Sequence, residues 1–145
     1  MTTVRDVYDF LDGIAPFAGQ EPGDNAGLQV GDFASAVESA VVCLDITPEV
    51  IAQAAARGAQ LIVSHHPVLF KARRQLPASD PAWLLARHGV AAIASHTPLD
   101  AMPGGVSDLM AERLGLKVIE STGILRLCKL KKAMPAKDFA ARAAH

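Results

Sequence analysis

The sequence is poor in cysteine and in aromatic residues, and the shortage of cysteine already excludes one class of protein. It contains two cysteines, Cys43 and Cys128, and neither belongs to a CxxC pair. Two isolated thiols inside apolar runs are typical of a reduced cytosolic protein and argue against a disulfide-stabilised scaffold. We interpret both as core residues, because free cysteine is usually buried.

The chain also lacks a long apolar run and an excess of charge of either sign. No apolar segment approaches the roughly 20 residues that a membrane-spanning helix needs. Arg5 and Asp6 interrupt the N-terminal segment, so we expect no secretory signal there. A formal net charge of −1, with scattered Lys and Arg, argues against binding of nucleic acid by bulk charge. We therefore expect a cytoplasmic protein that binds neither membrane nor nucleic acid.

What the chain does have is a hydrophobic content of 50%, arranged in alternating strand-like and helix-like segments. Short apolar runs predict strands at 27–31, 40–44, 61–63, 90–94, 116–119 and 124–130. Apolar residues at helical spacing, with capping residues before them and glycine or proline after them, predict helices at 4–14, 48–57, 80–88, 106–114 and 136–144. Ser107 is a possible cap of the fourth helix.

Strands that alternate with helices through short loops are typical of βαβ units. We therefore predict an α/β fold with a mainly parallel sheet flanked by helices, in which 116–119 forms a fourth strand. The length of 145 residues fits one domain, 1–145. The last helix-like segment still continues where the sequence stops at His145, so we expect this domain to be one part of a longer fold.

Polar clusters follow two of the expected strands at the point where each strand ends. His65 and His66 come directly after 61–63 and Ser64, and His96 and Asp100 come after 90–94. In open α/β sheets, ligands bind outside the carboxyl ends of the strands. The sequence therefore predicts that His65, His66, His96 and Asp100 lie at one edge of the sheet.

Histidine and carboxylate side chains are ligands for Zn, Fe, Mn or Ni. Adjacent side chains such as His65 and His66 are expected to diverge, which favours two ions about 3.5–4 Å apart over one. The alternative is a His-His pair with a purely structural role. His96 is either a ligand or a hydrogen-bond partner of a ligand.

The loop residues Asp24, Asn25 and Asp45 either face the same site or are ordinary turn and cap residues. Two ions would need about five or six protein ligands, and this chain supplies fewer. The remaining ligands must come from another segment, another subunit or water.

Four segments match, in order, the motifs of one known family. They are Asp24–Gly31 (DNxGLxVG), Leu44–Val50 (LDxTPEV), Ser64–Lys71 (SHHPxxFK) and His96–Val106 (HTxLDxxPGGV). The sequence resembles the type 2 homologues of GTP cyclohydrolase I, which are also called Nif-three-like proteins. The match runs over nearly the whole chain, and the combination is far more specific than any single motif.

The resemblance implies a fold of two related α/β lobes with a dinuclear metal centre between them, assembled into a hexameric ring. This chain would be the N-terminal metal-binding lobe, with the C-terminal lobe missing. By position, the implied metal ligands are His65, His66 and Asp100, with His96 close to two divalent ions. A further His and Glu belong to the C-terminal region of the family, which this sequence does not reach.

We therefore predict a metal-dependent hydrolase, in which a metal-bound water attacks an electrophilic carbon or phosphorus. His96 and Asp45 are the candidate catalytic groups for proton transfer. The family name points to a nucleotide-like substrate such as GTP, although the sequence has no P-loop and no GxGxxG motif. The alternatives are a non-enzymatic role in metal handling, a regulatory scaffold that binds proteins, or a different two-metal phosphoesterase, which would need more Asp or Asn ligands.

Overall fold

The structure, a computed structural model, describes residues 1–144. The chain divides into two compact units, Met1–Pro98 and Leu99–His145. His145, where the sequence analysis finds a helix still continuing, lies outside the described residues. Within residues 1–144, no helix combines the length and the apolar character that crossing a membrane requires.

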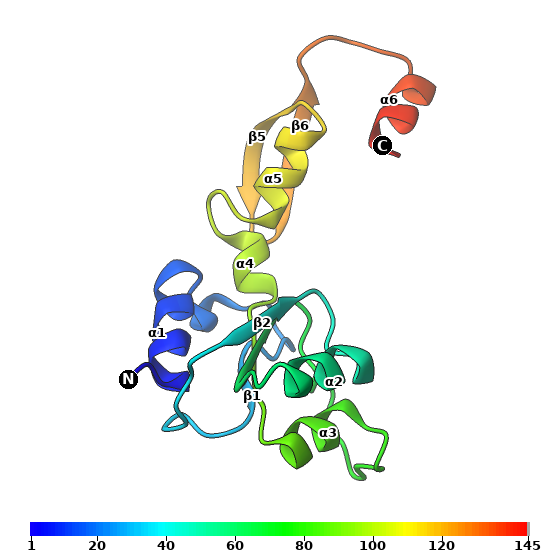
Figure 1. The fold of residues 1–145 in the computed structure, drawn as a ribbon. Helices are drawn as coiled ribbons and strands as arrows, with labels where there is room; N and C mark the ends of the chain where they lie inside the picture. The colour runs from blue at the N-terminus through cyan, green and yellow to red at the C-terminus, as the bar shows by residue number, and fades with distance from the viewer. Residues whose placement is uncertain (145) are drawn as a thin grey trace. The chain divides into compact units, whose positions relative to one another are not determined.

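The first unit is built on a four-stranded sheet (Figure 1). The order of its strands is β1-β4-β3-β2. Its strands are β1 (Gly27–Val30), β2 (Ala40–Cys43), β3 (Leu61–Ser64) and β4 (Ala91–Ala94). Strands β2, β3 and β4 are parallel, whereas β1 runs antiparallel to β4, with Gly27 opposite Ala94. The predicted α/β fold with a mainly parallel sheet is confirmed, with one antiparallel strand at its edge.

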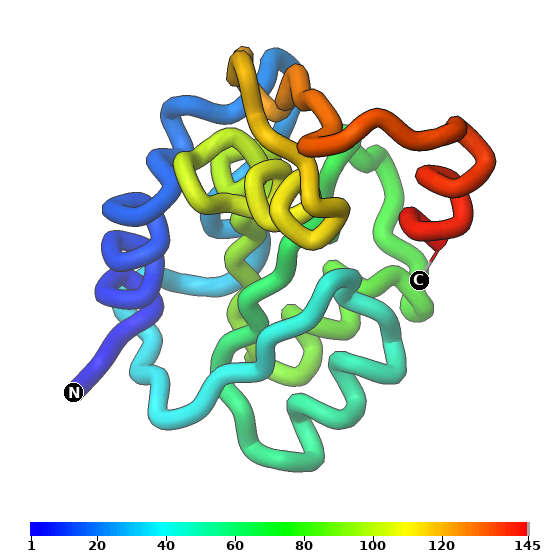
Figure 2. Tube along the Cα trace, turned by 90° about the horizontal axis from the view of Figure 1, so that it is seen from above, coloured from blue at the N-terminus to red at the C-terminus, as the bar shows by residue number. Residues whose placement is uncertain are grey.

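Helices cover both faces of this sheet. They are α1 (Val4–Ile14), the short 3-10 helix η1 (Phe17–Gly19), α2 (Pro48–Ala56) and α3 (Pro81–His88). Figure 2 shows α1 in blue on one side of the strands and α2 in teal on the other.

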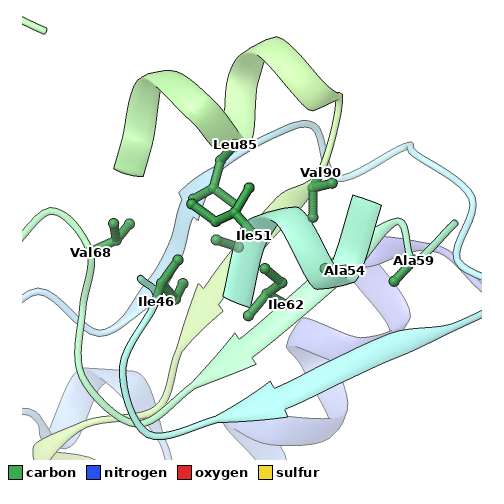
Figure 3. Close-up of a cluster of buried hydrophobic side chains, with 9 residues drawn as sticks. Ile46, Ile51, Ala54, Ala59, Ile62, Val68, Leu85 and Val90 are labelled. Atoms are coloured by element: carbon green, nitrogen blue, oxygen red, sulfur yellow. The ribbon is translucent and has the colours of Figure 1, made fainter. Parts of the chain in front are cut away.

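Successive residues of β3 belong to different cores because side chains alternate along a strand. Leu61 packs in a cluster with Val4 of α1, whereas Ile62 packs in a cluster with Ile51 of α2 and Leu85 of α3 (Figure 3). The central strands β3 and β4 are therefore buried on both faces, as their continuous apolar sequences predict, whereas the edge strand β2 exposes one face at Val42.

The helix ends follow the signals in the sequence. Thr3 caps α1, because its hydroxyl accepts a 3.3 Å hydrogen bond from the backbone N–H of Asp6, and its own N–H donates to the Asp6 carboxylate at 2.7 Å. The Thr47 hydroxyl caps α2 by accepting from the N–H of Val50 at 3.3 Å. Gly89 ends α3 in the left-handed conformation, with φ 66°.

A glycine directly after β1 allows this strand to approach β4 closely. Gly31 has φ 108°, and a Cβ atom there would lie 2.6 Å from the Cβ atom of Ala91. A larger residue would therefore have to displace β1 from β4.

Helix α4 (Thr97–Ala101) contains the boundary between the two units. The second unit continues with α5 (Val106–Arg113), β5 (Leu116–Thr122), β6 (Leu125–Leu130) and α6 (Ala136–Ala143). Strands β5 and β6 form a two-stranded antiparallel sheet of their own.

The strand predicted at 116–119 is present as the first part of β5. It lies outside the main sheet, because the chain turns back at Gly123 (φ 52°) and β5 pairs with β6. Ser107 does not cap α5, because Gly105 holds the N-cap position, and the Ser107 hydroxyl donates instead to the carbonyl of Ile124 at 2.7 Å.

Both cysteines are free thiols and are partly buried. Cys43 lies on β2 and packs against the core below α2. Burial raises the pKa of the Cys43 thiol, and the nearby charge of Asp45 raises this pKa further.

Candidate metal centre

Three histidines gather at the carboxyl ends of two adjacent parallel strands. His65 and His66 follow β3 directly, and His96 lies two residues after the end of β4. One ring nitrogen from each histidine lies within 4.8 Å of the others. The prediction that these three side chains share one edge of the sheet is confirmed.

The neighbouring histidines stay close to each other, although adjacent side chains on a regular strand would diverge. The ring centroids of His65 and His66 are 5.0 Å apart, and each lies within 5.7 Å of the His96 ring. The strand has ended at this point, and the Ser64 hydroxyl donates to the carbonyl of His66 at 2.8 Å. This local turn lets both rings face His96.

Two carboxylates hold two of the imidazole rings through Nδ1. Asp45 Oδ1 lies 2.7 Å from Nδ1 of His66, and Asp24 Oδ1 lies 2.8 Å from Nδ1 of His96. An ionised carboxylate only accepts hydrogen bonds, so in both histidines Nδ1 carries the proton and donates it. In the neutral imidazole the lone pair is then on Nε2, which is the arrangement typical of histidines that bind metal ions.

A backbone carbonyl plays the same part for the third ring. Nδ1 of His65 lies 3.1 Å from the carbonyl oxygen of Ser95, the residue that precedes His96. The carbonyl also only accepts, so His65 has the same tautomer as the other two rings. Ser95 in turn donates its backbone N–H to the carbonyl of Ser64 at 2.9 Å, which ties the ends of β3 and β4 together.

Asp24 reaches the site because β1 runs antiparallel to its neighbour. The start of β1 lies beside the end of β4, so the loop before Gly27 meets His96. The Asp24 side chain is only 3% exposed and also accepts hydrogen bonds from the backbone N–H and the hydroxyl of Thr97. Burial raises the pKa of Asp24, but the bonds from Thr97, His96 and the N–H of Asn25 outweigh it, so the pKa of Asp24 is lowered overall.

The same loop also fastens the segment that follows the histidine pair. The Asn25 side-chain amide donates to the carbonyl of Leu69 at 2.6 Å, and the Gln29 side-chain oxygen accepts from the N–H of Leu69 at 3.2 Å. Asn25 and Gln29 are linked by a 2.6 Å hydrogen bond from the Gln29 amide to the Asn25 carbonyl. The polar residues of 24–29 therefore position both sides of the histidine cluster.

The other candidate residues occupy different positions. Asp45 follows β2, at the same edge as the histidines, and its side chain is 58% exposed. Asp100 lies in α4, on the C-terminal side of the boundary between the units, and its role as a ligand stays a prediction. His88 lies in the last turn of α3 and does not belong to the cluster.

The donor set fits a transition-metal ion. Imidazole nitrogens suit Zn, Fe and Ni, and three protein ligands are the number that a catalytic zinc ion commonly has. Hydrogen-bonded acceptors behind each ring fix its orientation, as metal sites require. The three histidines can therefore hold a metal ion.

Comparison with known proteins supplies the family. The model of the family described as Duf34/NIF3 (NGG1p interacting factor 3) matches residues 2–145. The chain belongs to this family. The resemblance to the type 2 homologues of GTP cyclohydrolase I is confirmed, since relatives of this chain carry that name.

One such relative of the Duf34/NIF3 chain is a GTP cyclohydrolase 1 type 2 homolog of Staphylococcus aureus, 38% identical over 119 residues, with 80% of this chain and 32% of the relative covered. A relative of the same name from Clostridium acetobutylicum is 28% identical over 156 residues, with 96% of this chain and 57% of the relative covered. The crystal structure of a Bacillus cereus protein related to NIF3 superposes with a TM-score of 0.75 at 30% identity, with 81% of this chain and 34% of that chain covered.

The match covers most of this chain but only part of the length of these relatives. This chain spans about a third of the Staphylococcus aureus protein and of the Bacillus cereus structure, at 32% and 34% of their lengths. The activity and assembly of a whole family member are therefore matters for proposal.

Proposed function

We propose that this chain carries the metal centre of a divalent-metal-dependent hydrolase. The observation that supports the proposal most directly is the convergence of one ring nitrogen each from His65, His66 and His96 to within 4.8 Å. Three imidazoles that have their Nδ1 atoms occupied by acceptors are prepared to bind through Nε2.

We further propose a dinuclear centre with Zn, Fe, Mn or Ni ions, in which Asp100 joins the histidines as a ligand. Three histidines satisfy one ion, and a second ion needs further oxygen or nitrogen donors. Asp100 supplies one such donor in the family motif, and the others would come from another segment, another subunit or water. The ring-shaped homo-oligomer and the cytoplasmic location remain predictions alongside this one.

A divalent ion bound there supplies a Lewis acid and lowers the pKa of a water molecule toward neutrality. The chain's own residues then have separate tasks. Asp45 holds the Nδ1–H of His66 and, being 58% exposed, connects the site to solvent for proton transfer. His96 lies beside the other two rings and is held by buried Asp24, so it can bind an ion or donate a hydrogen bond to the reacting group. Proton transfer by His96 and Asp45 is thus part of the proposal.

The substrate class that we propose is a small nucleotide-like molecule. The name of the relatives, GTP cyclohydrolase 1 type 2 homolog, is the origin of this choice. A second candidate function is metal handling without catalysis. The 45% exposure of the His66 side chain favours it, because a ligand open to solvent allows an ion to be exchanged.

Metal analysis tests the proposal. After loading with Zn²⁺ and dialysis, the wild-type chain should retain about one tightly bound ion, since three histidines satisfy a single ion. His65→Ala should lose most of this metal, because it removes one of three converging donors, and Asp100→Ala should weaken retention of any further ion. His88→Ala serves as the control and should retain the wild-type amount. A His65→Ala protein with full metal content would refute the proposed site.

Hydrolase activity separates the two candidate functions. In a whole family member, turnover of a nucleotide that disappears together with metal in the His65→Ala variant supports the enzyme. Metal binding without turnover of any nucleotide or phosphoester supports metal handling.

A further inference from the structure

A cavity of about 500 Å³ adjoins the histidine cluster. It is lined by residues 24–25, 69–73 and 76 of the first unit. Two of these residues contact the cluster directly, since Asp24 binds Nδ1 of His96 and the Phe70 ring centroid lies 6.0 Å from that of His96. The volume lies within the range of about 300–1,000 Å³ that is usual for small-molecule sites.

The aromatic ring of Phe70 lies between the cavity and the histidines, because it lines the cavity and also contacts His96. Phe70 is 49% exposed, although a phenylalanine in the core would be buried. Its ring is nearly perpendicular to that of His96, at 82°, so it meets the imidazole in an edge arrangement. An exposed aromatic ring that lines a cavity is a group on which a flat ring can stack.

One cation of the cavity is available for a ligand. Arg73 is engaged, because its guanidinium pairs with Asp80 and donates to the carbonyl of Val68 at 2.7 Å. Lys71 is exposed and, among residues 1–144, has no ion pair. Asp24 is the acidic residue of the lining, and its carboxylate already accepts hydrogen bonds from His96 and Thr97.

We propose that this cavity is the substrate-binding part of the site, and that it takes a flat heteroaromatic ring carrying a phosphate group. The ring stacks on Phe70, and the phosphate pairs with the ammonium group of Lys71. This inference rests on the proposed function, because only a reactive centre at the histidines gives the cavity a substrate to hold. Phe70 and Lys71 are specificity-determining residues in this arrangement, and neither is a metal ligand.

The test measures ligand binding without metal, so that chelation by the phosphate cannot contribute. The probes are guanosine 5′-monophosphate, guanosine and ribose 5-phosphate, titrated into the metal-free 145-residue chain by calorimetry. The monophosphate should bind more tightly than either of the other two, because it alone presents both the ring and the phosphate.

Matched variants assign the two contacts. Lys71→Ala should weaken binding of the monophosphate about tenfold and leave guanosine unchanged, because a charge-assisted contact is lost. Lys71→Arg should keep most of the affinity. Phe70→Ala should weaken the monophosphate and guanosine about tenfold and leave ribose 5-phosphate unchanged. The controls Lys131→Ala and Phe10→Ala change an exposed residue of the same type outside the cavity, and they should behave as wild type.

The outcomes distinguish this inference from the proposed metal site. Both cavity variants should retain the wild-type amount of metal, because neither removes an imidazole. Normal metal binding combined with no effect of Lys71→Ala and Phe70→Ala on the monophosphate overturns the inference and leaves the metal site intact. The expected binding pattern in a protein that retains no metal supports the cavity and contradicts the proposed function.

Discussion

At the scale of single residues, two carboxylates that each bind a histidine differ in their exposure to solvent. Asp24 and Asp45 each accept a hydrogen bond from a histidine Nδ1, but Asp24 is 3% exposed and Asp45 is 58% exposed. Solvent screens the electrostatic interaction of the exposed Asp45–His66 pair strongly, and that of the buried Asp24–His96 pair only weakly. We therefore expect Asp24 to contribute more to the orientation of the His96 ring than Asp45 contributes to the orientation of the His66 ring.

This difference predicts the effect of Asp24→Ala. The variant should lower metal affinity about 10–100-fold, because a ring that has lost its acceptor is no longer held in one tautomer. It should also lower the free energy of unfolding by about 1–3 kcal/mol, since the N–H and hydroxyl of Thr97 lose a buried acceptor. Metal titration and denaturant unfolding measure the two effects.

Asp45→Ala is the matched comparison. It should weaken metal binding with a smaller loss of unfolding free energy, because the groups around Asp45 are solvated. Equal losses of unfolding free energy in Asp24→Ala and Asp45→Ala would contradict the prediction that the buried carboxylate contributes more to stability.

The sequence was informative about the histidines for a physical reason. A polar residue that follows a buried apolar run lies at a strand end, so the carboxyl-end positions of His65, His66 and His96 follow from local pattern alone. The role of Asp24 depends on the antiparallel direction of β1, which the four-residue segment Gly27–Val30 does not reveal. The sequence alone left two alternatives for Asp24, a residue that faces the site or an ordinary turn residue.

At the scale of elements, most boundaries of strands and helices were predictable, whereas helix α4, the end of β5 at Thr122 and the pairing of β5 were not. Apolar runs and capping residues fix where elements begin and end, and Thr3, Thr47 and Gly89 behave as expected. Strand pairing depends on the turn that follows β5. Gly123, with φ 52°, was the available signal for a hairpin between β5 and β6.

An ion pair between Asp108 of α5 and Arg126 of β6 contributes to the stability of the second unit, and its acid should make that stability depend on pH. The side-chain bond from Arg126 and the backbone N–H of Gly104 hold the pKa of Asp108 below its usual value of 3.8. The pKa is lower in the folded state than in the unfolded state. The stabilisation is therefore present above about pH 3.8 and is lost as the pH falls through the folded-state pKa.

We expect Asp108→Asn to lower the unfolding free energy at neutral pH and to approach the wild-type value as the pH falls below about 3.8. Urea unfolding followed by circular dichroism over a pH series measures this difference. Asp6 and Glu49, in the first turns of α1 and α2, also have pKa values lowered by hydrogen bonds. Both residues are present in the wild type and in the variant, so their contributions cancel in the difference between the two. A difference that stays constant with pH would show that the Arg126 contact contributes nothing through its charge.

At the scale of the whole molecule, the second unit exposes apolar side chains on its hairpin. Ile119, Leu125 and Leu127 are 58%, 68% and 59% exposed, and the alternation of β6 places Leu125 and Leu127 on the same face. Clustered apolar side chains on a surface usually mark an interface. The predicted homo-oligomer therefore has a candidate contact surface in this hairpin.

Sedimentation velocity checks this prediction. The wild-type chain should associate as its concentration rises, and Leu125→Lys combined with Leu127→Lys should shift it toward the monomer. Phe10→Lys, which changes a 69% exposed residue of α1, is the control and should associate as wild type does. A wild-type chain that stays monomeric at high concentration would remove the hairpin as an interface.

The three acceptors behind the imidazole rings come from three separate segments of the chain. Ser95 follows β4, Asp45 follows β2, and Asp24 precedes β1. The cluster thus exists only while the whole sheet is paired, so an ion that binds it selects the folded state over every partly opened one. At a hundredfold excess over its dissociation constant, such an ion adds about 2.7 kcal/mol to the folding equilibrium. A chelator would withdraw that stabilisation from all four strands together and would lower the free energy of unfolding of the chain by the same amount.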